Sequence, residues 1–122
     1  MLSLDLFHNI TSAVDFPAGS VIFRQGDPGE EMYLIKEGVV EIQTDAGFVA
    51  KLEAGDIFGE MSLIGDEPRS ATAAALTDCS LIPVDEERFL FLVQQTPYFS
   101  LYVMSVLAKR LRLRDKKDGS RK

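Results

Sequence analysis

Short stretches in which apolar and polar residues alternate fill the first two thirds of the chain and predict β-strands. These stretches are rich in β-branched and aromatic residues, as strands usually are. Eight of the nine glycines lie between residues 19 and 65, where they separate one stretch from the next. The predicted strand segments are SVIFRQ, EMYLIKE, VVEIQT, FVAKLE and TAAALTDCSLIPV. Many short strands with glycine-rich turns indicate a β-sandwich or a β-barrel.

Two of the turns between these strands have residues that favour a tight reversal. They are Gly-Asp-Pro-Gly at 26–29 and Asp-Ala-Gly at 45–47. Glycine and aspartate tolerate a positive φ, and proline fixes the first turn position. We expect a β-hairpin at each of them.

The pattern becomes helical after Val84. Asp85 is a plausible N-cap for a helix over EERFLFLVQQ, and Thr96 followed by Pro97 predicts the start of a second, longer helix. Apolar residues at three-four spacing form one stripe along that helix: Phe99, Tyr102, Val103, Val106, Leu107 and Leu111. Near the other end of the sequence, residues 2–10 predict a short helix with a weak apolar stripe.

The length and the composition of the chain fit one domain and weigh against some classes of function. The 122 residues are 46% hydrophobic and 26% charged, which suits a single globular core. No apolar run approaches about 20 residues, and the start MLSLDLFHNI has no basic region. We therefore expect neither a membrane span nor a signal peptide, and we expect the protein to be cytoplasmic. The single cysteine, Cys79, reads as a small hydrophobic residue in a strand. The single histidine, His8, cannot build a histidine-rich metal site, which weighs against a barrel enzyme of the cupin type. We expect a protein that is not an enzyme, with no catalytic residues and no bound metal.

Charge is distributed unevenly around the net value of −6. Residues 1–108 carry five basic and 17 acidic side chains, whereas residues 109–122 carry eight basic and two acidic ones. Binding to a nucleic acid backbone relies on many lysine and arginine contacts, so the acidic body argues against a nucleic acid partner. Any anion site in the body must therefore be local.

The segment FGEMSLIGDEPRSATAAA, residues 58–75, interrupts the strand pattern and is the candidate for such a local site. Arg69 is the only basic residue between Lys51 and Arg88. Residues 59–63 can form one helical turn whose free N–H groups favour an anion, and an arginine fork suits phosphate oxygens. A carboxylate from Glu60 and this guanidinium in one pocket would suit a ligand with both a hydroxyl and a phosphate. By chemistry alone, the opposite interpretation stays open: Arg69 as a surface residue paired with Asp66 or Glu67, and Glu60 as a solvated carboxylate.

The stretch GEMSLIGDEPRSATAAA resembles the phosphate-binding cassette of the cyclic-nucleotide-binding domain family. The resemblance extends over FPAGSVIFRQGDPGEEMYLIKEG, AGDIFGE and the two C-terminal helices, and the similarity includes protein kinase A regulatory subunits, catabolite activator proteins and, most of all, bacterial cyclic-nucleotide-gated channels. It implies a mainly β fold with flanking α-helices. The expected architecture is an eight-stranded β-roll, a double-stranded β-helix jelly roll, with a short N-terminal helix, a cassette helix and two C-terminal helices.

The expected organisation is a single domain over residues 1–122. It divides into an N-terminal helical segment (1–15), a β-roll (16–84) with the cassette at 58–71, lid helices (85–115) and a basic tail (116–122). Two departures from the family pattern are a short N-terminal helical part and the lack of a helix-turn-helix after the last helix. We therefore do not expect a DNA-binding regulator from this chain alone.

The resemblance implies a role for each residue of the cassette. Glu60, with the Gly59 backbone beside it, would accept a hydrogen bond from the ribose 2′-hydroxyl. Arg69 would neutralise the cyclic phosphate. The further cassette positions expected to bind ligand are Met61, Ser62, Ser70 and Ala71, of which Ser62, Ser70 and Ala71 would offer main-chain N–H groups and Ser70 also its hydroxyl.

The resemblance also implies a wall and a lid for the base. The wall would comprise Ile42, Ala50, Leu52 and Phe58. The lid would be the final helix, with Arg110 over the purine and Leu111, Leu113 and Arg114 as its cap. Both sets have plainer interpretations, as ordinary core residues for the wall and as part of a solvated basic tail for Arg110.

The expected function is that of a sensor, in which binding of a cyclic nucleotide monophosphate changes what the last helix touches. The alanine- and serine-rich cassette favours cAMP, with cGMP as the other candidate ligand, and no other cofactor is expected. An effector domain or protein partner would be reached through the C-terminal helix. The alternative is a degenerate domain of this fold that docks a protein and binds no nucleotide, against which the intact Glu60 and Arg69 argue.

Overall fold

The computed structural model describes residues 13–65 and 67–117. These residues fall into two compact units, divided between Phe89 and Leu90. The predicted helix at residues 2–10 and His8 lie outside the described residues.

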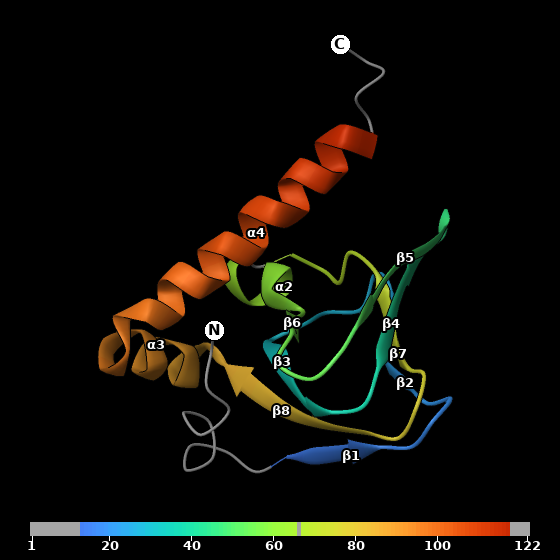
Figure 1. Ribbon diagram of the computed structural model, residues 1–122, viewed down its shortest axis with the longest axis horizontal. Helices are drawn as coiled ribbons and strands as arrows, with labels where there is room; N and C mark the ends of the chain where they lie inside the picture. Colours follow the sequence, from blue (N-terminus) through green and yellow to red (C-terminus); the bar gives the residue numbers. More distant parts are fainter. Residues whose placement is uncertain (1–12, 66, 118–122) are drawn as a thin grey trace. The chain divides into compact units, whose positions relative to one another are not determined.

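The larger unit is built from two antiparallel sheets of four strands each (Figure 1). One sheet has the order β1-β8-β3-β6 and the other β2-β7-β4-β5. The strand bounds are β1 (Val14–Phe16), β2 (Val21–Phe23), β3 (Glu31–Glu37), β4 (Val40–Thr44), β5 (Gly47–Leu52), β6 (Ile57–Phe58), β7 (Thr72–Ala75) and β8 (Cys79–Asp85). The predicted fold class, an eight-stranded β-roll with flanking helices, is confirmed.

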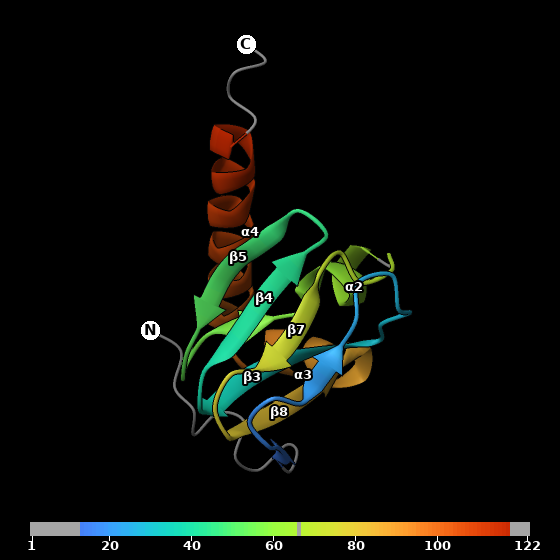
Figure 2. The same ribbon diagram turned by 90° about the vertical axis from the view of Figure 1, so that its right-hand side faces the viewer.

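The core of this unit lies between the two sheets, which face each other in Figure 2. Its buried cluster takes residues from both sheets: Ile35, Val40, Phe58, Ala73, Ala75, Cys79 and Leu81. Cys79 is free and buried at the start of β8, as expected for a small hydrophobic residue in a strand. The small side chains of Ala73 and Ala75 on β7 leave room for the larger residues that face them, because protein interiors are packed to nearly crystalline density.

One of the two predicted hairpins is confirmed and the other is wrong. β4 and β5 form a hairpin in which Thr44 pairs with Gly47, and Gly47 has a φ of 119°. The chain does turn beside this motif, at residues 24–27, where the amide of Asp27 donates to the carbonyl of Arg24 at 3.0 Å. However, β2 pairs with β7 and β3 pairs with β8 and β6, so this turn carries the chain from one sheet to the other. Turn chemistry fixes a local reversal of the backbone and leaves the strand partners undetermined.

The first strand begins two residues before the predicted start of the β-roll at residue 16. Val14 pairs with Leu81, and Phe16 pairs with Cys79. Residues 14 and 15, placed by the sequence in the N-terminal helical segment, therefore belong to β1. A strand of three residues is too short to show a period-two pattern, so its backbone pairing with β8 defines it.

Three helices complete the described part: α2 (Glu60–Gly65), α3 (Glu86–Gln95) and α4 (Pro97–Lys117). The bounds predicted for α3 and the start predicted for α4 are confirmed. Asp85 is the N-cap of α3, since its Oδ1 accepts a hydrogen bond from the amide of Arg88 at 2.9 Å. On α4 the predicted apolar stripe is buried or half-buried from Phe99 to Leu107, whereas Tyr98, Leu101 and Met104 are exposed.

Membrane-spanning character is weak in these helices. Over residues 13–65 and 67–117, no single helix is long and apolar enough to cross a bilayer; α3 and the first part of α4 meet that test only as a bent pair.

Candidate functional site

The cassette follows β6 directly, and a glycine makes the connection possible. Gly59 has a φ of 82°, a left-handed conformation that residues with a Cβ adopt at a cost. A Cβ at this position would lie 2.9 Å from Nη1 of Arg69 and 3.3 Å from the carbonyl oxygen of Glu31. Gly59 therefore allows the backbone to turn into α2 and leaves space for the arginine.

Glu60 is the first residue of α2 and is almost completely buried, with 1% of its surface exposed. Ser62 on the same helix is also buried, whereas Met61 is 42% exposed. A carboxylate seldom occupies such a position unless it has a task or a partner, because removing a charge from water is costly. The interpretation of Glu60 as a solvated loop carboxylate is therefore wrong.

Arg69 is buried as well, with 6% of its surface exposed. Its Nη1 donates a hydrogen bond to the carbonyl oxygen of Gly59 at 3.1 Å, which ties it to the start of α2. Its backbone exchanges two hydrogen bonds of 2.8 Å with the β2–β3 turn, one to the carbonyl of Asp27 and one from the amide of Gly26. Arg69 is thus fixed at both its main chain and its side chain.

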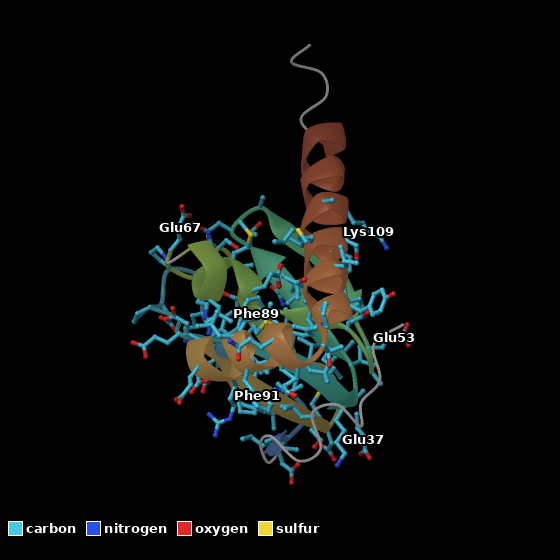
Figure 3. The ribbon with its side chains drawn as sticks, turned by 90° about the vertical axis from the view of Figure 1, so that its left-hand side faces the viewer. Glu37, Glu53, Glu67, Phe89, Phe91 and Lys109 are labelled. Atoms are coloured by element: carbon cyan, nitrogen blue, oxygen red, sulfur yellow. The ribbon has the colours of Figure 1, made fainter. Side chains whose placement is uncertain are left out.

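The alternative of Arg69 as a surface residue paired with its acidic neighbours is contradicted by this burial. Figure 3 shows Glu67 extending outward near the end of α2, and Glu67 is exposed. The carboxylates that influence Arg69 are instead Glu31, Asp27 and Glu60. These acids belong to the β2–β3 region and to α2, so the arginine points into the unit.

The electrostatics of this region leave Arg69 a cation with unused hydrogen-bonding capacity. Burial lowers the pKa of Arg69, while Tyr33 and then the carboxylates of Glu31, Asp27 and Glu60 act to raise it. Its Nε is buried, and no described residue accepts a hydrogen bond from it. A buried donor without a partner is unfavourable, and an anion beside the guanidinium would relieve that cost.

Tyr33 belongs to the same charged neighbourhood. Its hydroxyl donates to Oε1 of Glu31 at 3.3 Å. The pKa of Tyr33 is raised by burial first and by the charge of Glu31 second, with Arg69 acting in the opposite direction. No metal is indicated here, since no group of three or more His, Cys, Asp or Glu within the described ranges could hold one.

The cassette ends by entering β7. Ser70, directly after Arg69, is exposed, and Ala71 is half-buried. The hydroxyl of Thr72, the first residue of β7, accepts a hydrogen bond from the amide of Gln25 at 2.9 Å, which joins the residue after the cassette to the β2–β3 turn. The structure therefore brings Gly59, Glu60 and Arg69 together, and residues 70–71 connect Arg69 to β7.

The predicted base wall divides between the two sheets. Ile42 lies opposite both Ala50 and Ala73, and Leu52 lies opposite Val40, so Ile42, Ala50 and Leu52 share one face of the β4–β5 hairpin. All three are half-buried and keep some accessible surface.

Phe58, the fourth predicted wall residue, is 2% exposed and belongs to the core cluster. The core interpretation therefore describes Phe58 best.

The predicted lid residues lie beyond the described side chains. The backbone of α4 runs through residues 110–114. The side chains of Arg110, Leu111, Leu113 and Arg114 lie outside the described part, so their contact with a base stays a prediction.

Three residues near Arg69 were not predicted from the sequence. Cζ of Arg69 lies 4.0 Å from the centroid of the Phe23 ring, and Tyr33 contributes to the charge environment. A Cβ on Gly29 would collide with the Arg69 side chain. Gly29 carried a signal, because it stands in a turn motif, but nothing in the sequence links Phe23 to a residue 46 positions away.

Comparison with known proteins establishes the family. Residues 13–96 match the family described as "Cyclic nucleotide-binding domain". The chain belongs to this family. It is 38% identical over 105 residues to the "Cyclic AMP receptor protein" of Thermus thermophilus, covering 82% of this chain and 49% of that protein. It is 44% identical over 81 residues to a cyclic nucleotide-gated potassium channel of Rhizobium etli, covering 66% of this chain and 22% of the channel.

Solved structures agree with this assignment. The catabolite activator protein of Thermus thermophilus superimposes with a TM-score of 0.80 at 34% identity, covering 92% of this chain and 60% of that one. The EAL enzyme Bd1971 has been solved in a cAMP-bound and a cGMP-bound form; each is 38% identical, with TM-scores of 0.64 and 0.65, and each match covers 82% of this chain and 28% of the enzyme. The chain thus spans about half the length of the first curated relatives it matches, or less.

Proposed function

We propose that this domain binds a cyclic nucleotide monophosphate, with Arg69 on the cyclic phosphate and Glu60 on the ribose 2′-hydroxyl. The observation that carries the proposal is the placement of a buried guanidinium and a buried carboxylate at the two ends of one short cassette, joined through the carbonyl of Gly59. A phosphate supplies the negative charge that the buried Nε of Arg69 can use. A hydroxyl supplies a donor for the carboxylate.

The preferred ligand in this proposal is cAMP. Its support is the likeness to a protein named as a cyclic AMP receptor and the small residues of the cassette. The enzyme Bd1971, which is similar to this chain, accepts both cAMP and cGMP, and the exposed hydroxyl of Ser70 could serve either phosphate. We therefore expect a modest preference for cAMP and measurable binding of cGMP.

Calorimetric titration of the domain with cAMP, cGMP and a cyclic dinucleotide tests the binding proposal. The two mononucleotides should bind at one site per chain, cAMP more tightly, and the dinucleotide should not compete. If neither mononucleotide binds, the domain is of the degenerate kind that keeps the fold as a docking surface.

We further propose that binding is coupled to the C-terminal half of α4, through which the domain would act on an effector domain or protein partner. The apolar stripe of α4 is continuous to Leu107, and five basic residues follow between positions 109 and 116, where they repel one another. That half of the helix should be marginally stable without a further contact, which a bound purine could provide through Arg110 and Leu113. A ligand can bias such an element only by its different affinity for the two states.

Amide hydrogen exchange with and without cAMP tests this coupling. Protection of residues 108–115 should rise when cAMP is added, and a chain truncated after Ala108 should bind more weakly because linkage is reciprocal. Equal protection in both states would mean that α4 is a fixed element and that the response lies elsewhere.

A further inference from the structure

An aromatic ring supports the guanidinium of Arg69 from the core side. Phe23 is the last residue of β2, and it pairs with Ala73 of β7, the strand that follows the cassette. This pairing brings the end of β2 beside the loop that contains Arg69. Cζ of Arg69 lies 4.0 Å from the centroid of the Phe23 ring, well inside the range of a cation–π interaction.

The ring of Phe23 is held in place by two further aromatic side chains. Its centroid lies 6.2 Å from that of Tyr33 and 5.9 Å from that of Phe58. Tyr33 and Phe58 are themselves stacked with centroids 5.3 Å apart. The three rings form one cluster, which we call the aromatic platform. Because Phe58 is fully buried in the core, the platform fixes the position of the Phe23 ring.

The uncharged ring of Phe23 supports Arg69 without accepting the hydrogen bonds that its N–H groups can donate to a ligand. A carboxylate paired with Arg69 would accept hydrogen bonds from the N–H groups of the guanidinium and so compete with an incoming phosphate. The face of an aromatic ring stabilises the cation and leaves the N–H donors in the guanidinium plane available. Of these donors, one on Nη1 is directed to Gly59, and the one on Nε has no acceptor among the described residues.

We propose that Phe23 is a positioning residue for cyclic nucleotide binding, which holds the guanidinium of Arg69 through its ring face and keeps its donors free for the phosphate. This inference rests on the proposed function of Arg69. Phe23 lies outside the cassette and shares no sequence motif with it.

Affinity measurements on three variants test the proposal. Phe23→Leu removes the ring and keeps an apolar side chain, whereas Phe23→Tyr keeps the ring. Phe16→Leu is the matched control, because Phe16 is a half-buried phenylalanine that packs against the same core from β1. Urea unfolding of each variant gives the stability change that accompanies any change in affinity.

The loss of affinity should be selective for removal of the Phe23 ring. Phe23→Leu should raise the Kd for cAMP and for cGMP alike by about fivefold to 20-fold, the range of a partly desolvated cation–π contact. Phe23→Tyr should keep the Kd within about twofold of the parent value. Phe16→Leu should also keep the Kd within about twofold, even where it lowers the unfolding free energy by as much as Phe23→Leu does. Equal affinity losses in Phe23→Leu and Phe16→Leu would overturn the proposal, since packing alone would then explain both.

A readout without ligand separates this inference from the proposed function. The ring current of Phe23 should shift the Nε–Hε resonance of Arg69, and that shift should disappear in Phe23→Leu but not in Phe16→Leu. An unchanged resonance would overturn the stacked arrangement whatever the domain binds. If the parent binds no cyclic nucleotide, the proposed function falls and the positioning role falls with it; if the parent binds and Phe23→Leu binds equally well, only the positioning role falls.

Discussion

The backbone of Gly29 lies so close to the side chain of Arg69 that a Cβ at position 29 would collide with Nε and Cζ of the guanidinium. The φ of Gly29 lies outside the left-handed region, so alanine is compatible with the backbone there. The requirement for glycine therefore comes from the space that Arg69 occupies. It links the β2–β3 turn to the cassette 40 residues later.

Gly29→Ala should weaken cyclic nucleotide binding by about tenfold and change the unfolding free energy by less than about 1 kcal/mol, because the arginine must move aside and no core residue is altered. Calorimetry with cAMP measures the first effect and urea unfolding the second. Gly65→Ala is the control. It adds the same methyl group at the end of α2, where the nearest atom is Cγ of Glu67 at 3.9 Å. If both variants bind as the parent does, Arg69 has no need of its present position.

Arg69→Met should keep the fold, with an unfolding free energy within about 1 kcal/mol of the parent. Burial is the largest influence on the pKa of Arg69 and lowers it, so the fold bears a cost for the charge. An apolar side chain of similar length removes the cost of burying the charge and loses one hydrogen bond from a charged donor to Gly59, worth roughly 1.5–3 kcal/mol, so the two effects offset each other. Urea unfolding gives the result. A loss of more than about 3 kcal/mol would assign Arg69 a structural role.

Glu60→Gln should weaken cAMP binding less than a change at Arg69 does, and it should reduce discrimination against 2′-deoxy cAMP. The parent should bind the deoxy analogue more weakly by about 1–3 kcal/mol, because a buried acceptor then loses its donor. Parallel titrations of both ligands into parent and variant measure this. If the parent binds the two ligands equally, the role assigned to Glu60 is wrong.

Stability at alkaline pH should depend on Tyr33. Burial and the charge of Glu31 raise its pKa above the ordinary value of 10.0. The folded state therefore holds the phenol proton more tightly than the unfolded chain does. The resulting stability is present below pH 10.0 and is lost as the pH rises through the folded pKa.

Urea unfolding at a series of pH values between about 9 and 11 should show the parent losing stability faster than Tyr33→Phe does. Tyr98→Phe, which removes an exposed phenol from α4, is the control and should follow the parent. Identical pH slopes for the parent and Tyr33→Phe would show that the environment of Tyr33 does not favour the neutral phenol.

Local patterns in the sequence predicted most of the elements. The bounds of α3 and the start of α4 agree with the structure, because capping by Asp85 and the fixed φ of Pro97 are local effects. The β4–β5 hairpin also agrees with the structure, because its turn residues act locally. The second expected hairpin failed at residues 26–29, since the choice of partner strands depends on which apolar faces can be buried together across the whole roll.

The site was predictable to the extent that it lies within one continuous segment. Glu60 and Arg69 stood out because the cassette motif contains both. Phe23 and Gly29 did not, since each meets Arg69 only after β2 has paired with β7 and the β2–β3 turn has bonded to the cassette backbone. Contacts of this kind depend on tertiary packing, on which no local pattern reports.

Titration of cAMP into Arg69→Ala tests whether Arg69 binds the phosphate of a cyclic nucleotide. Arg24→Ala is the matched control, because Arg24 is an exposed arginine on the neighbouring turn and its loss removes the same formal charge. We predict that Arg69→Ala abolishes measurable binding while it keeps a cooperative unfolding transition, and that Arg24→Ala binds as the parent does. Affinity of Arg69→Ala within about threefold of the parent, roughly 0.65 kcal/mol, would contradict the assignment.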